Sequence, residues 1–379
     1  MSGEVRQNTS VATGVIATAP SATESASDPA LDTNPESVGA EWHNTTSGEI
    51  FICWDNTAGL NKWKGQKGNV VQPARGIFWS GTQTAPDADS NIIDYITIDS
   101  LGNATDFGDA HVMSRTSGTC SNGVTGRGVK GGGNYGVVIG NTDRRMDDME
   151  YITIDSAGNA ADFGNLTQIR SQVSAVSNAS DDRGVWGGGY AGSTVNTLDY
   201  VTISSAANAV DFGNASTVMQ DNSATSNGTN ERGVFFSGNR TSNYVNIIDY
   251  ITIDSAGNAT DFGDTLAGVA FSTACSNQTN ERGICFAGNT SGGSQDVIQY
   301  ITINSTGNAA DFGDALAAMY GAAGTSNGTG ERGVIGGGYP GGVNHNVIQY
   351  ITINSAGDAA DFGDLTEVRS MLGACSNAG

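Results

Sequence analysis

From about residue 75 onward, short apolar runs alternate along the chain with segments rich in glycine, asparagine and serine. One kind of run follows an Arg-Gly pair, as in GVFFSG after Arg232, and another contains Tyr-Ile-Thr-Ile, as at Tyr250. Both kinds are short and rich in β-branched and aromatic residues, which favours strands over helices. Because most neighbouring positions within a run are apolar, we expect both faces of each strand to be buried.

These runs belong to a unit of about 50 residues that occurs six times. A variable loop separates the two runs, and the second run leads through a turn such as Ser255–Asn258 into Asp-Phe-Gly. Asp-Phe-Gly also marks the magnesium loop of protein kinases, but a catalytic loop occurs once per domain, so six copies indicate an architectural element. Each copy begins with an arginine: Arg75, Arg127, Arg183, Arg232, Arg282 and Arg332.

The phenylalanine of each Asp-Phe-Gly is expected to fill the space between neighbouring sheets, and the glycine after it allows close backbone approach. The repeated arginines are expected to pair with aspartates of the repeat or with backbone carbonyls at a strand start. The phenylalanines are Phe107, Phe163, Phe212, Phe262, Phe312 and Phe362.

Four strands per unit at this period predict an all-β fold, a six-bladed β-propeller. The first unit starts at Arg75 with no first strand before it, and the chain ends on such a strand, MLGACSN from Met371. We therefore expect the C-terminal strand to complete the first blade and close the ring, which leaves no open edge. The propeller is expected to span residues 67–379.

Two segments precede the propeller. Residues 1–38 are rich in serine, threonine and alanine and predict an extended arm that is ordered only against a partner. Residues 39–66 predict a small β-hairpin module. Its aromatic side chains are dense for so small a module, so we expect them to mediate assembly with the propeller or with further copies, for example in a trimer. They are Trp42, Phe51, Trp54 and Trp63.

The repeat resembles the kelch repeat of β-propellers. Gly188-Gly189 and Gly337-Gly338 stand at the place of the kelch double glycine, Tyr200 and Tyr350 near its tyrosine, and Phe212 and Phe362 near its tryptophan. The chain departs from that pattern by using phenylalanine for tryptophan, and we therefore call the repeat kelch-like.

Two longer stretches resemble virion proteins of tailed, especially marine, bacteriophages. They are WHNTTSGEIFICWDNTAGLNKW and the YITIDSAGNATDFGD repeats. The resemblance implies a virion structural protein of tail-fibre or appendage type, whose arm binds other virion proteins. It also implies synthesis in the host cytoplasm without a signal peptide, and the N-terminus indeed lacks a basic start followed by an apolar core.

The charge of the chain excludes some partners. Seventeen Lys and Arg stand against 39 Asp and Glu, for a net charge of −22. So negative a chain repels phosphate backbones and anionic lipid, so neither nucleic-acid binding nor membrane insertion is expected. No apolar run approaches the roughly 20 residues that span a bilayer.

Little in the sequence indicates catalysis, and no cofactor or metal is expected. The three histidines, His43, His111 and His345, share no pattern. Calcium binding by Asp99, Asn103, Asp106 and their equivalents stays open, although their spacing matches no known loop. The turn TIDSAGNATDF is similar to the Asp-box of sialidases, but that box is a folding element.

The five cysteines are expected to be buried, reduced thiols. Cys120, Cys275 and Cys375 occupy one position in three repeats, too far apart to bridge in a radial fold. A Cys275–Cys285 disulfide across a hairpin stays open as the alternative.

The variable loops carry the candidate binding residues, because the six loops share one face of a four-stranded meander. Tyrosine and arginine offer large contact area at low entropic cost. The residues are Tyr135, Arg144, Arg145, Tyr190, Arg240, Tyr244, Tyr339 and His345. We expect this face to contact a host-surface glycan or protein. A purely structural capsid-decorating or head-fibre protein is the alternative, and an intracellular kelch-like scaffold is the third interpretation.

Overall fold

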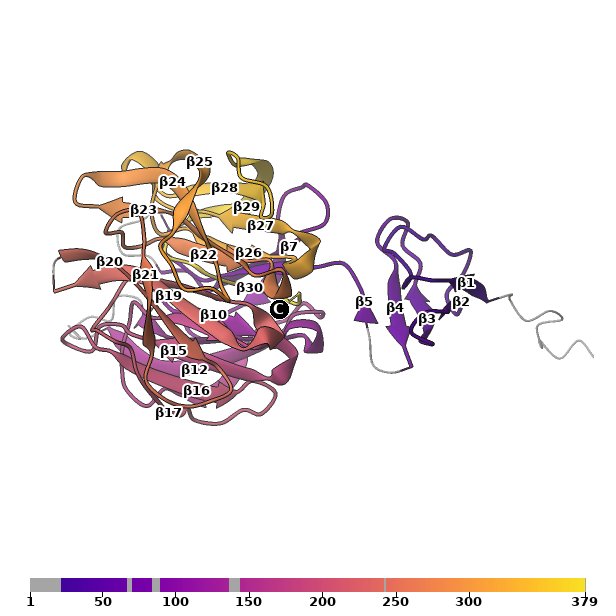
Figure 1. Cartoon of the computed structure of the whole chain (residues 1–379), viewed down its shortest axis with the longest axis horizontal. Coiled ribbons are helices and arrows are strands. Elements are labelled where there is room, and N and C mark those ends of the chain that lie inside the picture. The colour runs from indigo at the N-terminus through magenta and orange to yellow at the C-terminus, as the bar shows by residue number, and fades with distance from the viewer. Residues whose placement is uncertain (1–21, 67–69, 84–88, 136–143, 242, 379) are drawn as a thin grey trace, which may run out of the picture. The chain divides into compact units, whose positions relative to one another are not determined.

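The computed structural model describes residues 22–66, 70–83, 89–135, 144–241 and 243–378. The fold is all-β, and the chain divides into two units, Met1–Pro73 and Ala74–Gly379 (Figure 1). Among the described residues, no helix has the length and apolar character needed to cross a membrane.

The smaller unit is one five-stranded sheet. Its strands pair in the order β1 (Thr23–Ser25), β2 (Glu41–Asn44), β3 (Ile50–Asp55), β4 (Lys62–Gly65) and β5 (Val70–Val71). Strand β1 runs parallel to β2, and the other pairs are antiparallel.

The expected divisions at residues 38/39 and 66/67 fall inside this unit. Strand β1 comes from the segment that we expected to be an arm, and the Leu31 carbonyl accepts a 2.8 Å hydrogen bond from the N–H of Asn61. Strand β5 comes from the segment assigned to the propeller. The physical reason is that a three-stranded hairpin module leaves strand edges unpaired, and the flanking segments cover both. Residues 1–21 of the expected arm lie outside the described residues.

The larger unit contains six antiparallel sheets, each built on a path of four strands. The four strands follow one another in sequence in five sheets, whereas in sheet 1 the C-terminal β30 comes first. Sheet 1 comprises β30 (Gly373–Ser376), β6 (Arg75–Trp79), β7 (Ile92–Thr97) and β8 (Thr105–Asp109). Sheet 2 comprises β10 (Gly118–Ser121), β11 (Arg127–Tyr135), β12 (Arg145–Thr153) and β13 (Ala161–Asn165), with β9 (Ser114–Arg115) also paired to β11. Sheet 3 comprises β14 (Ser174–Ser177), β15 (Arg183–Gly187), β16 (Thr197–Thr202) and β17 (Val210–Asn214).

The remaining sheets follow the same plan. Sheet 4 comprises β18 (Ser223–Ser226), β19 (Arg232–Arg240), β20 (Asn243–Thr252) and β21 (Thr260–Asp264). Sheet 5 comprises β22 (Thr273–Ser276), β23 (Arg282–Thr290), β24 (Gly293–Thr302) and β25 (Ala310–Met319). Sheet 6 comprises β26 (Ala323–Ser326), β27 (Arg332–Gly336), β28 (His345–Thr352) and β29 (Ala360–Arg369).

Short 3₁₀ turns join strands of five sheets. Five of them stand between a first and a second strand: η1 (Gly123–Thr125), η2 (Ala179–Asp181), η3 (Gly228–Asn230), η4 (Gln278–Asn280) and η5 (Gly328–Gly330). The sixth, η6 (Pro340–Gly342), stands between β27 and β28.

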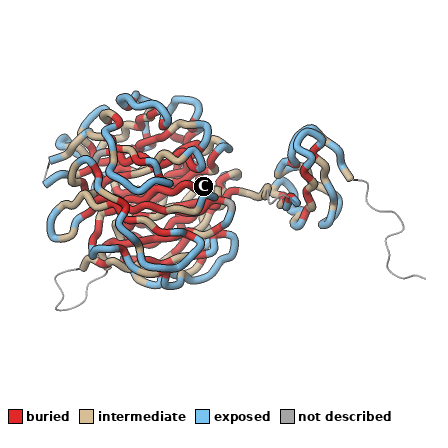
Figure 2. Tube along the Cα trace, turned by 60° about the horizontal axis from the view of Figure 1, so that its bottom comes forward, coloured by how far each residue is buried: buried red, intermediate tan, exposed pale blue. Residues whose placement is uncertain are grey.

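The C-terminal strand completes sheet 1, as the sequence predicts. Strand β30 pairs antiparallel with β6, with Gly373 opposite Trp79 and Ser376 opposite Gly76. The first strands contact one another in the order β10, β14, β18, β22, β26 and β30, and β30 contacts β10 again. The first and second strands of each sheet are mostly buried, and the exposed residues of this unit gather in the connections and on the fourth strands (Figure 2).

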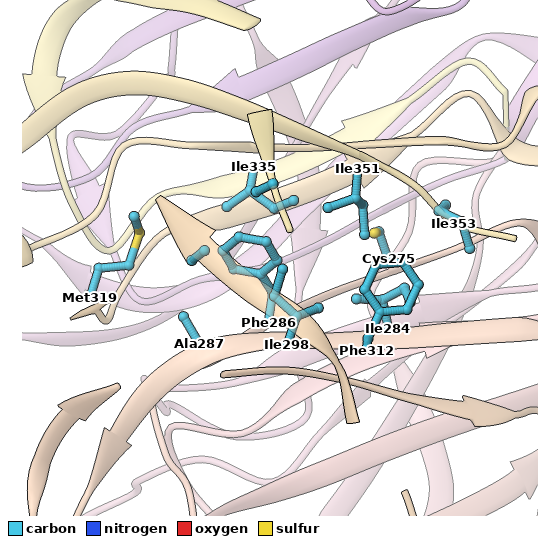
Figure 3. Close-up of a cluster of buried hydrophobic side chains, with 12 residues drawn as sticks. Cys275, Ile284, Phe286, Ala287, Ile298, Phe312, Met319, Ile335, Ile351 and Ile353 are labelled. Carbon is cyan, nitrogen blue, oxygen red and sulfur yellow. The ribbon is translucent and has the colours of Figure 1, made fainter. Parts of the chain in front are cut away.

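Apolar residues fill the spaces between successive sheets. In one such cluster, Phe312 of sheet 5 packs with Ile335 and Ile351 of sheet 6 (Figure 3). Equivalent clusters hold the other Asp-Phe-Gly phenylalanines, which are all buried. The expected role of these phenylalanines between sheets is therefore confirmed. Gly108 fits the same scheme, because a Cβ there would lie 2.6 Å from the Gly158 carbonyl.

The repeated arginines link each sheet to the next. The guanidinium of each lies over the tyrosine ring of its own sheet, with 4.4 to 5.1 Å between the guanidinium carbon and the ring centroid. Each also donates a hydrogen bond of 2.8 to 3.2 Å to a carbonyl just after a third strand. The pairs are Arg75–Ile154, Arg127–Ile203, Arg183–Ile253, Arg232–Ile303, Arg282–Ile353 and Arg332–Ile98. The expected pairing with backbone carbonyls is confirmed, and these arginines are committed to structural contacts.

Candidate binding face

Two sets of connections emerge at the same end of the six sheets. In a four-stranded meander, the loop from the second to the third strand and the connection from the fourth strand to the next sheet lie at one end. The second strands differ in how far they reach toward this end. Strands β6, β15 and β27 have five residues, whereas β11, β19 and β23 have nine. We call this end the loop face. The face is recessed at the sheets whose second strands are short.

A closed ring of backbone hydrogen bonds lies at the centre of the loop face. Each N–H in the ring donates to the carbonyl of the preceding member at 2.6 to 3.2 Å, and Thr116 donates to Met371, which closes the cycle. All six members have a left-handed backbone, with φ between 55° and 67°. They are Thr116, Gln172, Asp221, Phe271, Gly321 and Met371. The ring borders an axial cavity of about 120 Å³ that the first strands line.

A second hollow, of about 470 Å³, opens beside this ring on the loop face. It spans the region where sheets 6 and 1 are neighbours, and both have short second strands. Its volume is in the range of sites for small ligands. The walls combine aromatic, amide and hydroxyl side chains. They include Thr82, Gln83, Arg115, Asn134, Gln172, Tyr320, Tyr339, Asn344 and Ser370.

The aromatic wall of the hollow consists of rings that contact one another at a tilt. The centroids of Tyr320 and Tyr339 lie 5.3 Å apart, and Phe271 lies 5.8 Å behind Tyr320. Burial raises the pKa of Tyr320 above its ordinary value, so the ring stays neutral at physiological pH. Tyr320 therefore offers an uncharged aromatic surface to the hollow.

The structure distributes the sequence-predicted loop residues around the face instead of gathering them. Tyr339 lines the hollow, and His345 is the first residue of β28, where it pairs with Arg369. Arg145 lies 5.3 Å over the ring of Tyr190.

The other predicted residues lie elsewhere on the loop face. The hydroxyl of Tyr244 accepts a 2.9 Å hydrogen bond from Asn289. Tyr135 ends β11 and donates its N–H to the carbonyl of Arg144 at 2.8 Å, and Arg240 ends β19. Part of the predicted loop after Tyr135, residues 136–143, lies outside the described residues.

The loops between second and third strands predict Tyr339 but not Tyr320 or Arg115, because these two residues stand in connections from a fourth strand to the next sheet. Tyr320 precedes a ring residue in the connection between sheets 5 and 6. The residues at this position in the six connections are Arg115, Ser171, Gln220, Ala270, Tyr320 and Ser370, so the repeat is broken there as well. That divergence is the signal by which Tyr320 and Arg115 could have been found.

Buried polar residues on the third strands tie the sheets together below the loop face. Asp199 lies 2.9 Å from the guanidinium of Arg170, and Asp94 is paired in the same way with Arg369; the side chains of both pairs are fully buried. Burial lowers the pKa of both arginines. In sheet 6 the equivalent residue is Gln349, which donates to the sulfur of Met319 at 3.7 Å. The equivalent residue of sheet 4, Asp249, is buried without an arginine and accepts hydrogen bonds from the N–H and the hydroxyl of Ser216 at 2.8 and 2.6 Å.

A cluster of His111, Asp148 and Glu150 is the one group of possible metal ligands found among the described residues, with ligand atoms within 4.8 Å of one another. Burial raises the pKa of Asp148 to about 6. Glu150, however, already pairs with Lys130 at 2.7 Å and accepts a 3.1 Å hydrogen bond from the N–H of Val112. The Lys130 ammonium neutralises Glu150 without an ion, so the cluster is accounted for as a structural contact.

The residues considered for calcium have structural partners. Asp99 accepts hydrogen bonds from the N–H of Ala74 and from Asn327, at 2.7 and 3.0 Å. Asn103 accepts one from the N–H of Asp364 at 3.1 Å. Asp106 is exposed on β8.

All five cysteines are free and buried. In the hairpin, Cys275 lies opposite Ile284 and Cys285 lies opposite Ala274, so the alternative of a Cys275–Cys285 disulfide is not realised.

The four candidate assembly residues of the small unit have different environments. Phe51 and Trp63 are buried with Cys53 in the core of the unit, and Trp42 packs against them while donating its indole N–H to the carbonyl of Ser27. Trp54 is exposed, with Lys62 5.6 Å from its ring centroid. Phe51 and Trp63 are not on the surface, because the added strands give this unit a core of its own.

No protein-family model and no curated protein matches this chain.

Proposed function

We propose that the six sheets are the blades of a kelch-like six-bladed β-propeller. Three observations support this: the closed order of first strands, the closed ring of backbone hydrogen bonds, and the arginine links that run from each sheet to the next. Left-handed pairs such as Gly337-Gly338, with φ of 69° and 109°, stand where the kelch double glycine is expected.

The protein is, in this proposal, a structural protein of the virion of a tailed bacteriophage, of tail-fibre or appendage type. The resemblance of the Trp-rich segment and of the repeats to phage virion proteins supports this. The small unit and the residues before it bind other virion proteins and further copies of the chain, for example in a trimer. Trp54 is the exposed aromatic residue that suits such a contact.

The loop face contacts the host surface through a glycan or protein. One observation carries this part of the proposal: the sheets repeat closely, whereas the residues around the 470 Å³ hollow differ from sheet to sheet. A scaffold that is regular everywhere except at one concave face is typical of a binding protein.

A capsid-decorating or head-fibre role is the second candidate. Exposed apolar side chains recur near the end of the fourth strand in five sheets, where a shell protein could be contacted. They are Met113, Ile169, Leu266, Leu316 and Val368.

The test uses phage particles that carry the protein. Tyr339→Ala, with Tyr320→Ala as a second variant, should slow adsorption to host cells while the particles contain the normal amount of protein. Leu266→Ser with Leu316→Ser is the matched change outside the lining of the hollow and should leave adsorption unchanged. Normal adsorption of the tyrosine variants, with reduced incorporation of the leucine variants, would instead establish the decorating role.

A further inference from the structure

The hollow exists because two neighbouring sheets are short. Strand β6 ends at Trp79 and β27 ends at Gly336, whereas β11 of sheet 2 continues to Tyr135. Loops from both short sheets meet across the gap, where Asn344 donates a 2.9 Å hydrogen bond to the carbonyl of Thr82. The floor is formed by Thr116, Gln172 and Met371, which belong to the hydrogen-bonded ring and are therefore fixed.

The walls offer two kinds of contact that a ligand must match. Tyr320 and Tyr339 present rings of partial negative charge on their faces, which attract C–H groups. The amide side chains of Gln83, Asn134 and Gln172 also line the hollow. Gln83 donates to Glu367 and Asn134 donates to Thr116 at 3.4 Å, and each keeps an amide oxygen that can accept a hydrogen bond from a ligand. A ligand with an apolar C–H face and a rim of hydroxyl groups satisfies both walls.

Two buried oxygens in the lining lack a hydrogen-bond partner among the described residues. They are Oγ1 of Thr82 and Oδ1 of Asn344, and Asn344 is only 8% exposed. The hydrogen bond to Thr82 fixes the Asn344 amide, so its oxygen cannot turn away to find solvent. Both oxygens have essentially no exposed surface, so a ligand hydroxyl pairs with them only where the loops at Thr82 and Asn344 separate.

Charge selects against an anionic ligand. Arg115 is the cation in the lining, and it lies 3.4 Å from the buried carboxylate of Asp89. Its charge is therefore already compensated. The chain as a whole carries −22, which repels sialic acid, uronic acid and phosphate groups.

We propose that the hollow binds a neutral hexose unit of a polysaccharide, with the sugar ring on Tyr339 and its hydroxyls on Asn134 and Gln172. The source of the sugar, a host-surface glycan, rests on the proposed function. The choice of a neutral hexose rests on the lining of the hollow alone.

The test measures binding of the full-length protein to neutral oligosaccharides of glucose, galactose, mannose and N-acetylglucosamine, with sialylated and phosphorylated glycans beside them. Saturation-transfer NMR and calorimetry should detect at least one neutral sugar, and the charged glycans should not bind more tightly. Tyr339→Ala and Gln172→Ala should each weaken binding at least tenfold. Tyr190→Ala, on the same face but outside the hollow, should change it less than twofold, and all three variants should unfold at similar temperatures.

Failure of the inference and failure of the proposed function give different results. If Tyr339→Ala slows adsorption of particles but no neutral sugar binds, the face contacts another ligand and the hexose inference is wrong. If a neutral sugar binds and Tyr339→Ala abolishes that binding without affecting adsorption, the hexose site stands and the host-contact function is wrong. Binding that Tyr339→Ala and Tyr190→Ala weaken equally would also overturn the hexose site.

Discussion

The backbone N–H of Arg75 donates a 2.7 Å hydrogen bond to the side-chain oxygen of Asn377, across 302 residues of chain. In the other five sheets an asparagine five residues before the arginine accepts the same bond, at 2.6 to 2.8 Å. Asn377 also donates to Asp155 at 2.8 Å, as its counterparts donate to an acidic residue of a neighbouring sheet. Asn377 thus gives sheet 1 the two side-chain hydrogen bonds that each of the other five sheets obtains from an asparagine five residues before its repeat arginine.

Removal of Gly373–Gly379 should therefore destabilise the larger unit strongly. Strand β6 would lose its partner β30 and expose an edge, which promotes aggregation. Asn377→Ala should be milder, at about 1–3 kcal/mol, because it leaves β30 in place but removes the partner of the Arg75 N–H. Calorimetry and light scattering measure both, and a truncated protein that unfolds like the full chain would show that β30 is not needed for closure.

Repetition is what made the fold predictable. The six copies of Asp-Phe-Gly and of Arg-Gly could be placed between sheets because six positions with one sequence share one environment. The strand segment Met371–Asn377 could be matched to the missing first strand before Arg75. The hollow was not predictable, because the contact between Asn344 and Thr82 joins residues 262 apart whose loops differ in sequence from those of the other copies. The burial of Trp63 was missed for a similar reason: strands β1 and β5 come from segments with little strand pattern.

The buried pair of Asp94 and Arg369 allows a double-variant test that sheet 6 itself suggests. Arg369→Met alone should cost about 3–5 kcal/mol, because it leaves the buried Asp94 carboxylate without a charged partner, with only the N–H and hydroxyl of Thr366 as donors. Adding Asp94→Gln recreates the Gln349–Met319 arrangement and should restore most of the lost stability. Urea unfolding of the two single variants and the double variant gives the coupling energy. Additive losses in the double variant would contradict the charge-matching argument.

Asp221 should make the stability of the larger unit fall as pH rises. Burial raises its pKa to about 7 in the folded protein, whereas an aspartate in the unfolded chain titrates near pH 4. Between these values the folded protein holds a proton that the unfolded chain has released, so the free energy of unfolding decreases with pH, by at most about 1.4 kcal/mol per unit. The effect is absent below about pH 4 and complete above about pH 7.

Asp221→Asn should remove this dependence. Asparagine does not titrate and tolerates the left-handed backbone at this position, where φ is 55°. Urea unfolding of both proteins at pH 5 and pH 8 should therefore show the variant gaining stability relative to the native protein at pH 8. Parallel changes in the two proteins would mean that Asp221 does not titrate in this range.

The five cysteines should be unreactive in the folded protein. Burial raises the pKa of Cys275 to about 12 and that of Cys285 to about 11, so neither is a thiolate at neutral pH. A chromogenic disulfide reagent should therefore react slowly with the native protein and with five thiols per chain after denaturation. Rapid reaction of the native protein would show that the sheets open readily around these positions.

The two units should unfold independently, because each has its own apolar core. Trp63 is 1% exposed and packs with Phe51 and Cys53, whereas the clusters of the larger unit contain no described residue before Ala74. Trp63→Ala should cost about 3–5 kcal/mol, which exceeds what so small a core can lose, so the smaller unit should unfold. Limited proteolysis with mass spectrometry should then find cuts before Pro73 and an intact fragment near Ala74–Gly379, while calorimetry shows the main transition unchanged. Trp54→Ala, at a side chain that is 52% exposed, is the matched control and should leave the smaller unit protected. If Trp63→Ala also lowers the main transition, the two units stabilise each other and the division at Pro73 is not a folding boundary.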